Sequence, residues 1–144
     1  ISDDYRWRIM LCVMTITVNR FVKEEKPLTT HQLSEQYGLP ISLVTAAVNR
    51  LVAAKLLLNV VEKPGDDVCR FVPSVNPADL TLGEVIRRVG DTGSKGFIPG
   101  FDTRYGDINA TIDSIKETAL EKADKILVSS LTINDNRNEN SNRN

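Results

Sequence analysis

The chain has 144 residues, a formal net charge of −1, one histidine and two cysteines. This length provides for one compact core with an appended segment and leaves little room for two separate domains. The balanced charge argues against a nucleic-acid-binding protein with a general basic excess, and two widely separated cysteines argue against a disulfide framework.

Residues 4–23 are predicted to form the first helix. Apolar side chains occupy nearly every face of it beyond the first turn, so we expect it in the middle of the packing, with Asp3 or Asp4 as its cap. Its longest weakly polar run is too short to cross a bilayer. The two cysteines, Cys12 and Cys69, have apolar neighbours and are predicted to be buried free thiols.

A helix-turn-helix is predicted next. Thr29 and Gln32 have the spacing of a capping box, which opens a short helix, and Gly38 ends it. Pro40 suits the start of a second helix over residues 40–57, because its fixed backbone angle is already helical. Apolar residues at helical spacing predict that most of this second helix is buried, namely Leu43, Val44, Ala47, Val48, Leu51, Val52 and Ala54.

Residues 58–73 are predicted to form two strands around a Pro-Gly turn, which we call the wing. Val60, Val68 and Phe71 favour β structure, and the residues between them favour a reversal of the chain. Helix, turn, helix and hairpin in this order are the elements of a winged helix-turn-helix. We therefore expect a mainly α fold with a small β-hairpin wing and a long C-terminal helix.

A short helix and a loop are expected after the wing. Thr81 and Glu84 form a second capping-box pattern, and the helix that follows them is predicted to end at Gly90. The glycine-rich segment beyond it predicts a loop held by the apolar pair Phe97 and Ile98.

Residues 107–131 are predicted to form a long amphipathic helix. Its seam consists of Ile108, Ile112, Ile115, Ala119, Lys122 and Ile126. Such a seam packs either on its own domain or on the same helix of a second copy. The expected division is a winged-helix domain over residues 1–100, a C-terminal amphipathic helix within residues 101–131 and a disordered, asparagine-rich tail over residues 132–144.

No set of catalytic or ligand residues emerges from the sequence. His31, the single histidine, falls in an exposed first helical turn and lacks a nucleophile, an orienting partner or further metal ligands. Asp66 and Asp67 suit a solvated turn better than acid/base catalysis or metal binding. No phosphate-binding glycine loop is present. We therefore predict no enzyme activity, no metal or cofactor site and no small-molecule substrate.

The chain resembles the cytoplasmic C-terminal extension of YihY/BrkB-type inner-membrane proteins, a family long labelled ribonuclease BN. The resemblance covers residues 4–131 and rests on the C-terminal helix and on two stretches, KPLTTHQLSEQYGLPISLVTAAVNRLVAAKLL and RFVPSVNPADLTLGEVIRRVGDTG. It implies a winged helix that follows a bundle of membrane helices, on the cytoplasmic side of a bacterial inner membrane. A chain that starts at Ile1 without an initiator methionine agrees with such a fragment. The nuclease label finds no support, because one histidine cannot supply a histidine-rich zinc site.

The order of elements is also similar to that of the Rrf2 transcription regulators. The Rrf2 pattern has a glycine-rich wing and, in cluster-binding members, three closely spaced cysteines after it. This chain has Pro-Gly-Asp-Asp in the wing and no cysteine after Cys69. An iron–sulfur cluster is therefore not expected.

Two functions follow from these resemblances. The first is a non-catalytic interaction or regulatory module of an integral membrane protein, which binds a protein partner or its own membrane domain. The alternative is an Rrf2-like DNA-binding regulator that forms a homodimer through residues 107–131. Residues 40–72 carry four basic and three acidic side chains, so nucleic-acid binding is expected to be weak. The face for either partner consists of Ser42, Thr45 and Asn49, suited to base edges, and of Arg50, Lys63 and Arg70, suited to phosphates.

Overall fold

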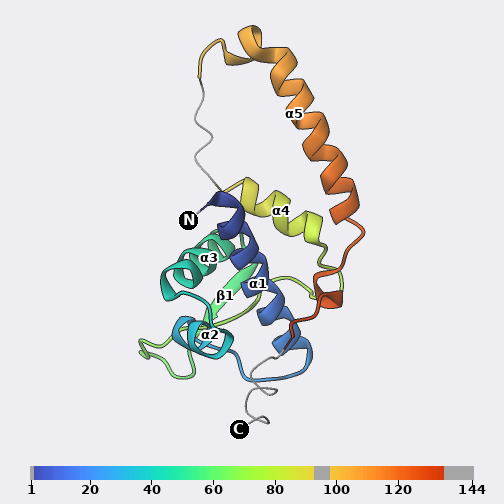
Figure 1. The fold of residues 1–144 in the computed structure, drawn as a ribbon. Helices are drawn as coiled ribbons and strands as arrows, with labels where there is room; N and C mark the ends of the chain where they lie inside the picture. Colours follow the sequence, from blue (N-terminus) through green and yellow to red (C-terminus); the bar gives the residue numbers. More distant parts are fainter. Residues whose placement is uncertain (1, 93–97, 135–144) are drawn as a thin grey trace.

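The computed structural model describes residues 2–92 and 98–134. The elements are α1 (Asp3–Val22), α2 (Thr30–Tyr37), α3 (Ile41–Ala53), β1 (Leu57–Val60), β2 (Arg70–Pro73), α4 (Leu82–Gly90), α5 (Phe101–Ala123) and the short 3-10 helix η1 (Val128–Ser130) (Figure 1). The predicted fold class, a mainly helical winged helix-turn-helix with a small antiparallel hairpin, is confirmed. The predicted disorder of residues 132–144 lies outside the described part from residue 135 on, and the predicted role of Phe97 in a loop lies outside it as well.

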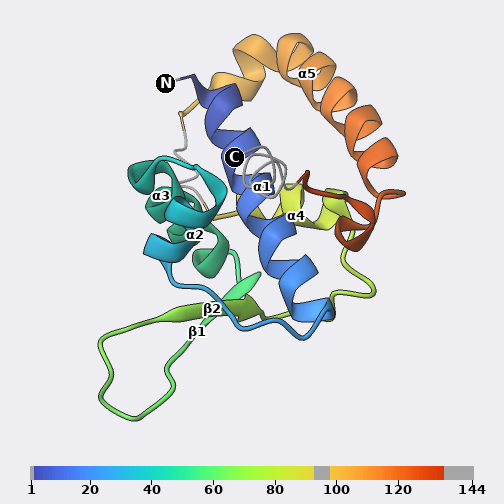
Figure 2. The same cartoon turned by 60° about the horizontal axis from the view of Figure 1, so that its bottom comes forward.

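Helix α1 lies at the centre of the fold, as its apolar composition predicts (Figure 2). Its buried residues include Ile9, Met10, Val13, Met14, Ile16 and Val18. The expectation that Asp3 or Asp4 caps this helix is wrong. The cap is Ser2, whose hydroxyl accepts a hydrogen bond from the Tyr5 backbone N–H at 3.2 Å. The two aspartates lie instead in the first turn, where their negative charge favours the positive end of the helix dipole.

The predicted capping box at the start of α2 is confirmed. Gln32 N–H donates to the Thr29 hydroxyl at 3.1 Å, and Thr29 N–H donates to Gln32 Oε1 at 3.0 Å. Gly38 follows α2 with a φ of 66°, a left-handed conformation that is least costly for glycine. The chain therefore leaves α2 sharply and enters α3 after Pro40.

Helix α3 is shorter than the predicted range 40–57, because it ends at Ala53. Lys55 has a φ of 60°, and this left-handed residue turns the chain so that β1 can begin at Leu57. Leu56 and Leu57 are both fully buried. The apolar residues after Ala53, which made the predicted helix too long, are therefore buried in the core although they lie outside the helix.

The wing has strands of four residues joined by the long loop 61–69. The paired residues are Leu57 with Pro73, Leu58 with Val72, Asn59 with Phe71 and Val60 with Arg70. Val68, predicted to lie in a strand, belongs to the exposed loop instead. The predicted burial of both thiols is also wrong, because Cys12 on α1 and Cys69 in this loop are both exposed.

Helix α4 shows only half of the second predicted capping box. The Thr81 hydroxyl accepts a hydrogen bond from Glu84 N–H at 3.1 Å. The Glu84 carboxylate accepts a hydrogen bond from Arg88 Nε at 2.7 Å, one turn along the helix, rather than one from the cap. The predicted end of this helix at Gly90 is correct.

Helix α5 begins at Phe101 and ends at Ala123, whereas the prediction was residues 107–131. Non-helical backbone angles at Tyr105 mark a kink in the first turns. After α5 the chain returns to the domain, where Leu82 N–H donates to the Ile126 carbonyl at 2.8 Å. Among the described residues, no helix combines the length and the apolar character that a membrane crossing requires.

Candidate nucleic-acid interface

The exposed edge of α3 carries three of the predicted site residues in one row. Ser42, Thr45 and Asn49 are separated by three and four positions, so they share one face of the helix, and all three are exposed. The opposite face anchors the helix in the core through Leu43, Val44, Ala47, Val48 and Leu51. Ala46 and Ala53 are exposed on the same side and were missed by the sequence analysis. Their methyl groups leave the polar row accessible.

Arg50, the fourth predicted residue of α3, is held by an aromatic ring. Its guanidinium carbon lies 5.5 Å from the centroid of the Trp7 ring on α1, within the range of a cation–π interaction. Trp7 itself is partly buried against the core. The pair fixes the direction of the arginine beside the polar row of α3. Nothing in the local sequence signals it, because the two residues are distant along the chain.

The two predicted phosphate-binding residues of the wing have different surroundings. Lys63 is exposed, and its backbone N–H donates to the Asp66 carboxylate at 3.2 Å in the turn of the loop. Arg70 is drawn inward, with only 15% of its side chain exposed. Its Nη1 donates to the Pro27 carbonyl at 3.0 Å and to Gln32 Oε1 at 2.9 Å. Arg70 therefore joins the wing to the start of α2, a structural role that the sequence analysis did not foresee.

Glu62 links two cations at the base of the wing. Its Oε1 lies 3.2 Å from Lys26 Nζ and 3.3 Å from Arg70 Nε. The hydrogen bond from Lys26, and after it the charges of Lys26 and Arg70, hold the pKa of the Glu62 carboxyl below its ordinary value. Lys26 and Arg70, the two cations at this junction, are thus both paired with the Glu62 carboxylate.

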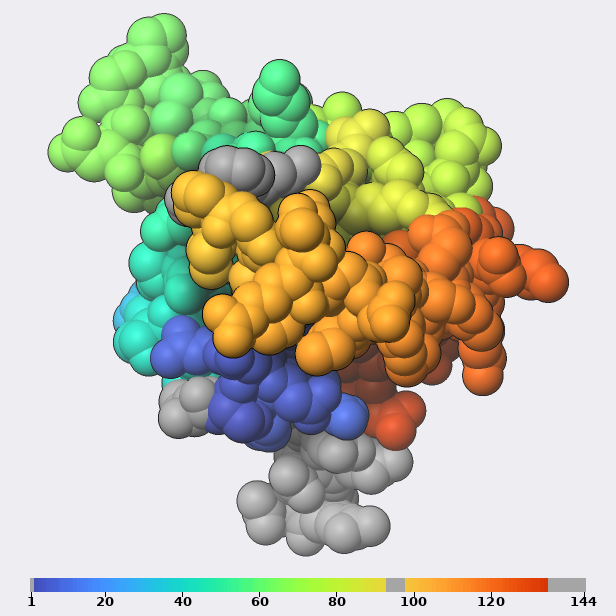
Figure 3. Space-filling view, turned by 90° about the horizontal axis from the view of Figure 1, so that it is seen from above, coloured from blue at the N-terminus to red at the C-terminus, as the bar shows by residue number. Residues whose placement is uncertain are grey.

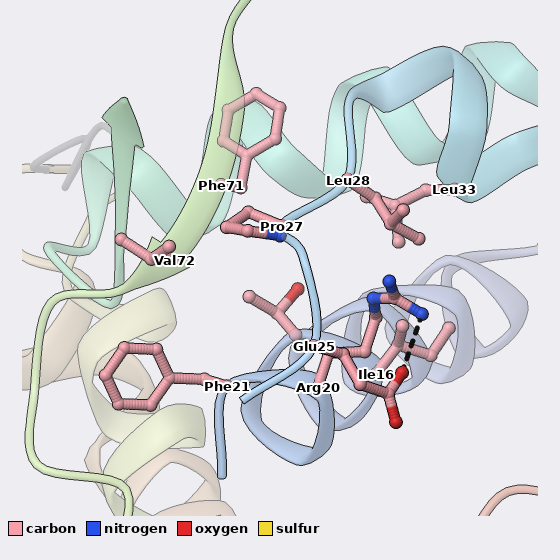
Figure 4. A pocket seen from close by; sticks show the side chains of 10 residues that line it. Ile16, Arg20, Phe21, Glu25, Pro27, Leu28, Leu33, Phe71 and Val72 are labelled. Atoms are coloured by element: carbon pink, nitrogen blue, oxygen red, sulfur yellow. Dashed lines mark ion pairs between the residues drawn. The ribbon is translucent and has the colours of Figure 1, made fainter. Parts of the chain in front are cut away.

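A small cavity lies under the wing, between α1 and β2 (Figure 4). Its volume is about 10 Å³, which suits at most one water molecule. Arg20 lines it but is already paired, with Nη1 2.9 Å from Glu25 and Nη2 donating to the Lys26 carbonyl at 2.7 Å. Within residues 2–92 and 98–134, no three histidine, cysteine, aspartate or glutamate side chains come together as metal ligands.

Helix α5 lies open on the face seen in Figure 3, and three exposed isoleucines at helical spacing form an apolar stripe along it. Ile108, Ile112 and Ile115 are exposed by 57%, 44% and 66%. The helix is attached to α4 through its other side, where Arg87 forms ion pairs with Glu117 and Asp124. In Figure 1, α5 extends away from α2 and the wing.

Comparisons with known proteins reveal similarity in fold. No protein-family model and no curated protein matches the chain. The solved structure of IscR from T. potens matches with a TM-score of 0.61 and 15% identity, over 99% of this chain and 89% of that one. CymR of B. subtilis, a global cysteine regulator, matches with a TM-score of 0.57 and 17% identity, over 92% of this chain and 98% of that one. CymR of Staphylococcus aureus matches with a TM-score of 0.59 and 13% identity, over 90% of this chain and 99% of that one.

The expected relation to YihY/BrkB membrane proteins is therefore wrong. The structures that share the fold over nearly the full chain are Rrf2-family regulators, and no comparison supports the membrane family. The expected location beside a membrane rested on that resemblance and loses its support with it. The order of helices and wing, which is similar to that of the Rrf2 regulators, was a better guide than the sequence stretches on which the membrane-family resemblance rested.

Proposed function

We propose that the chain is a non-catalytic, dimeric DNA-binding regulator. The observation that carries the proposal is the row of Ser42, Thr45 and Asn49 on the outside of α3, a helix that is otherwise anchored in the core. The wing projects from the side of the molecule that carries α2 and α3 in both ribbon views. The regulators of similar fold add support at the level of architecture.

The chemistry of the row suits base edges in a major groove. An asparagine amide pairs with the N6 and N7 of adenine, and serine and threonine hydroxyls donate to or accept from any base. Arg50, oriented by Trp7, and Lys63 on the wing are the proposed phosphate contacts. We do not propose Arg70 as a phosphate contact, because its guanidinium already donates hydrogen bonds to the Pro27 carbonyl and to Gln32.

The dimer is proposed to form through α5. The stripe of Ile108, Ile112 and Ile115 would pack on the same stripe of a second copy, as isologous helix pairs do. Two copies would present two α3 helices to a pseudo-palindromic site. A dimer also doubles the number of phosphate contacts, which compensates for the few cations on each copy.

A protein-binding module is the second candidate. It is favoured by the pairing of Lys26 and Arg70 with Glu62, which leaves the base of the wing with little free positive charge. In that case the same exposed edge of α3 would contact a protein.

Selection from a random duplex pool at low salt tests the proposal. We expect the wild type to enrich one sequence motif, since the row on α3 contacts base edges. The double variant Thr45→Ala/Asn49→Ala should enrich none, while its circular dichroism spectrum stays that of the wild type. Thr132→Ala, an exposed threonine in the segment after η1, serves as the matched control. No enrichment by the wild type, or an unchanged motif with the double variant, would reject the function.

A further inference from the structure

The base of the wing lies beside the connection between α1 and α2. Thr29 pairs with Arg70 in an antiparallel bridge, and Phe71 N–H donates to the Leu28 carbonyl at 3.2 Å. Residues 28 and 29 thus run along the outer edge of β2. Lys26 stands just before them in this connection, which passes beside the strands of the wing on its way to α2 (Figure 2).

Glu62 occupies the centre of this junction. One oxygen of its carboxylate faces both Lys26 Nζ and Arg70 Nε. Arg70 is mostly buried and bonded to two further acceptors, so its place does not depend on Glu62 alone. Lys26 differs, because its side chain is 65% exposed and Glu62 is its ion-pair partner. A lysine on a flexible, exposed stem turns readily from one anion to another.

We propose that Glu62 lowers the affinity of the domain for DNA of arbitrary sequence by holding Lys26 in an ion pair. This inference rests on the proposed function. A phosphate near the base of the wing must compete with the Glu62 carboxylate for Lys26, and the same carboxylate repels that phosphate. Binding then depends more on base contacts from α3 and less on the phosphates, which raises the ratio of specific to nonspecific affinity.

The variant Glu62→Gln tests the inference by releasing Lys26 while keeping the shape of the side chain. Each additional phosphate contact steepens the dependence of log K on log salt by about 0.9. We therefore expect a scrambled duplex to bind about fivefold to tenfold more tightly near 0.1 M salt, with a slope steeper by about one. The matched control is Asp67→Asn, which removes one negative charge from the same wing loop but from no ion pair among the described residues. It should leave the slope unchanged.

A double-mutant cycle with Lys26→Gln identifies the released cation. In the wild type, Lys26→Gln should hardly change binding to a scrambled duplex, because the lysine is occupied by Glu62. In the Glu62→Gln background it should remove most of the gain, leaving only the part that comes from relieved repulsion between Glu62 and the phosphate. Equal losses in both backgrounds, or equal effects of Glu62→Gln and Asp67→Asn, would overturn the inference while leaving the proposed function intact. If neither the wild type nor any variant binds duplex DNA, the inference and the proposed function fail together.

Discussion

The guanidinium of Arg50 lies over the indole ring of Trp7, with 5.5 Å between the guanidinium carbon and the ring centroid. This contact joins the exposed edge of α3 to the first turns of α1. Trp7 is the single tryptophan of the chain, so its fluorescence reports on this contact directly.

The first prediction concerns this pair. Arg50→Gln should change the emission of Trp7 and lower the free energy of unfolding by about 0.5–1 kcal/mol, the contribution of a cation–π contact at a partly exposed site. Fluorescence spectra and urea titrations measure the two effects. Arg8→Gln is the control, because Arg8 is bonded to Asp4 rather than to the indole. An emission spectrum that Arg50→Gln leaves unchanged would show that the guanidinium does not rest on the ring in solution.

The second prediction concerns the contact of α4 with the end of α5. A Cβ atom on Gly83 would overlap the carboxylate of Asp124 and lie 3.0 Å from the Asp124 backbone nitrogen. Gly83→Ala should therefore destabilise the domain, although alanine favours a helix by about 1 kcal/mol. Gly90→Ala is the control, since a Cβ there meets no atom within 4 Å. Thermal melts in which Gly83→Ala is as stable as Gly90→Ala would contradict the close approach.

The third prediction follows from the ion pair between Arg87 and Asp124 on the two helices. The hydrogen bond from Arg87 holds the pKa of the Asp124 carboxyl below its ordinary value. A carboxyl whose pKa is lower in the folded state stabilises the fold above its unfolded pKa, and this contribution is lost as the pH falls through the folded pKa. Asp124→Asn should thus melt at a lower temperature than the wild type at pH 7. The difference in melting temperature between the variant and the wild type should become smaller below about pH 4. A gap that stays constant from pH 7 to about pH 3 would show that the charge of Asp124 contributes nothing.

Local signals explain which parts of the fold could be predicted. The capping box of Thr29 and Gln32 and the buried face of α3 depend on residues within a few turns, and both were correct. The glycines between residues 90 and 107 favour a loop, so the sequence predicts the start of α5 too late. Gly106 lies inside the helix, which begins directly after the left-handed Gly100.

The candidate site was predicted less completely than the fold. The row on α3 follows from helical spacing alone, so the sequence indicates which of its residues lie together. Arg70 was expected to contact phosphate, yet its acceptors at Pro27 and Gln32 lie 43 and 38 positions earlier in the chain. Hydrogen bonds between residues so far apart in the chain produce no periodic pattern by which a single sequence could reveal them. Lys26 and Glu62 were missed for the same reason.

The fourth prediction concerns the dimer. Ile112→Glu should convert the protein to a monomer in sedimentation equilibrium, because it introduces a charge in the apolar stripe of α5. The matched control is Ser114→Glu, which adds the same side chain to the same helix away from the stripe. We expect the control to remain a dimer. A wild type that is monomeric at every concentration, or a control that dissociates equally, would contradict dimerisation through this stripe.

The central claim is that the outside of α3 distinguishes one DNA sequence from another. The most direct test is the ratio of affinities for the selected duplex and a scrambled duplex of equal length, measured by fluorescence anisotropy at one fixed salt concentration. Loss of a bidentate base contact costs about 1–3 kcal/mol of discrimination, so Asn49→Ala should lower the ratio about fivefold or more, with little change in scrambled binding. If Asn49→Ala leaves the ratio unchanged, or weakens both duplexes equally, α3 does not provide the base contacts and the account is wrong.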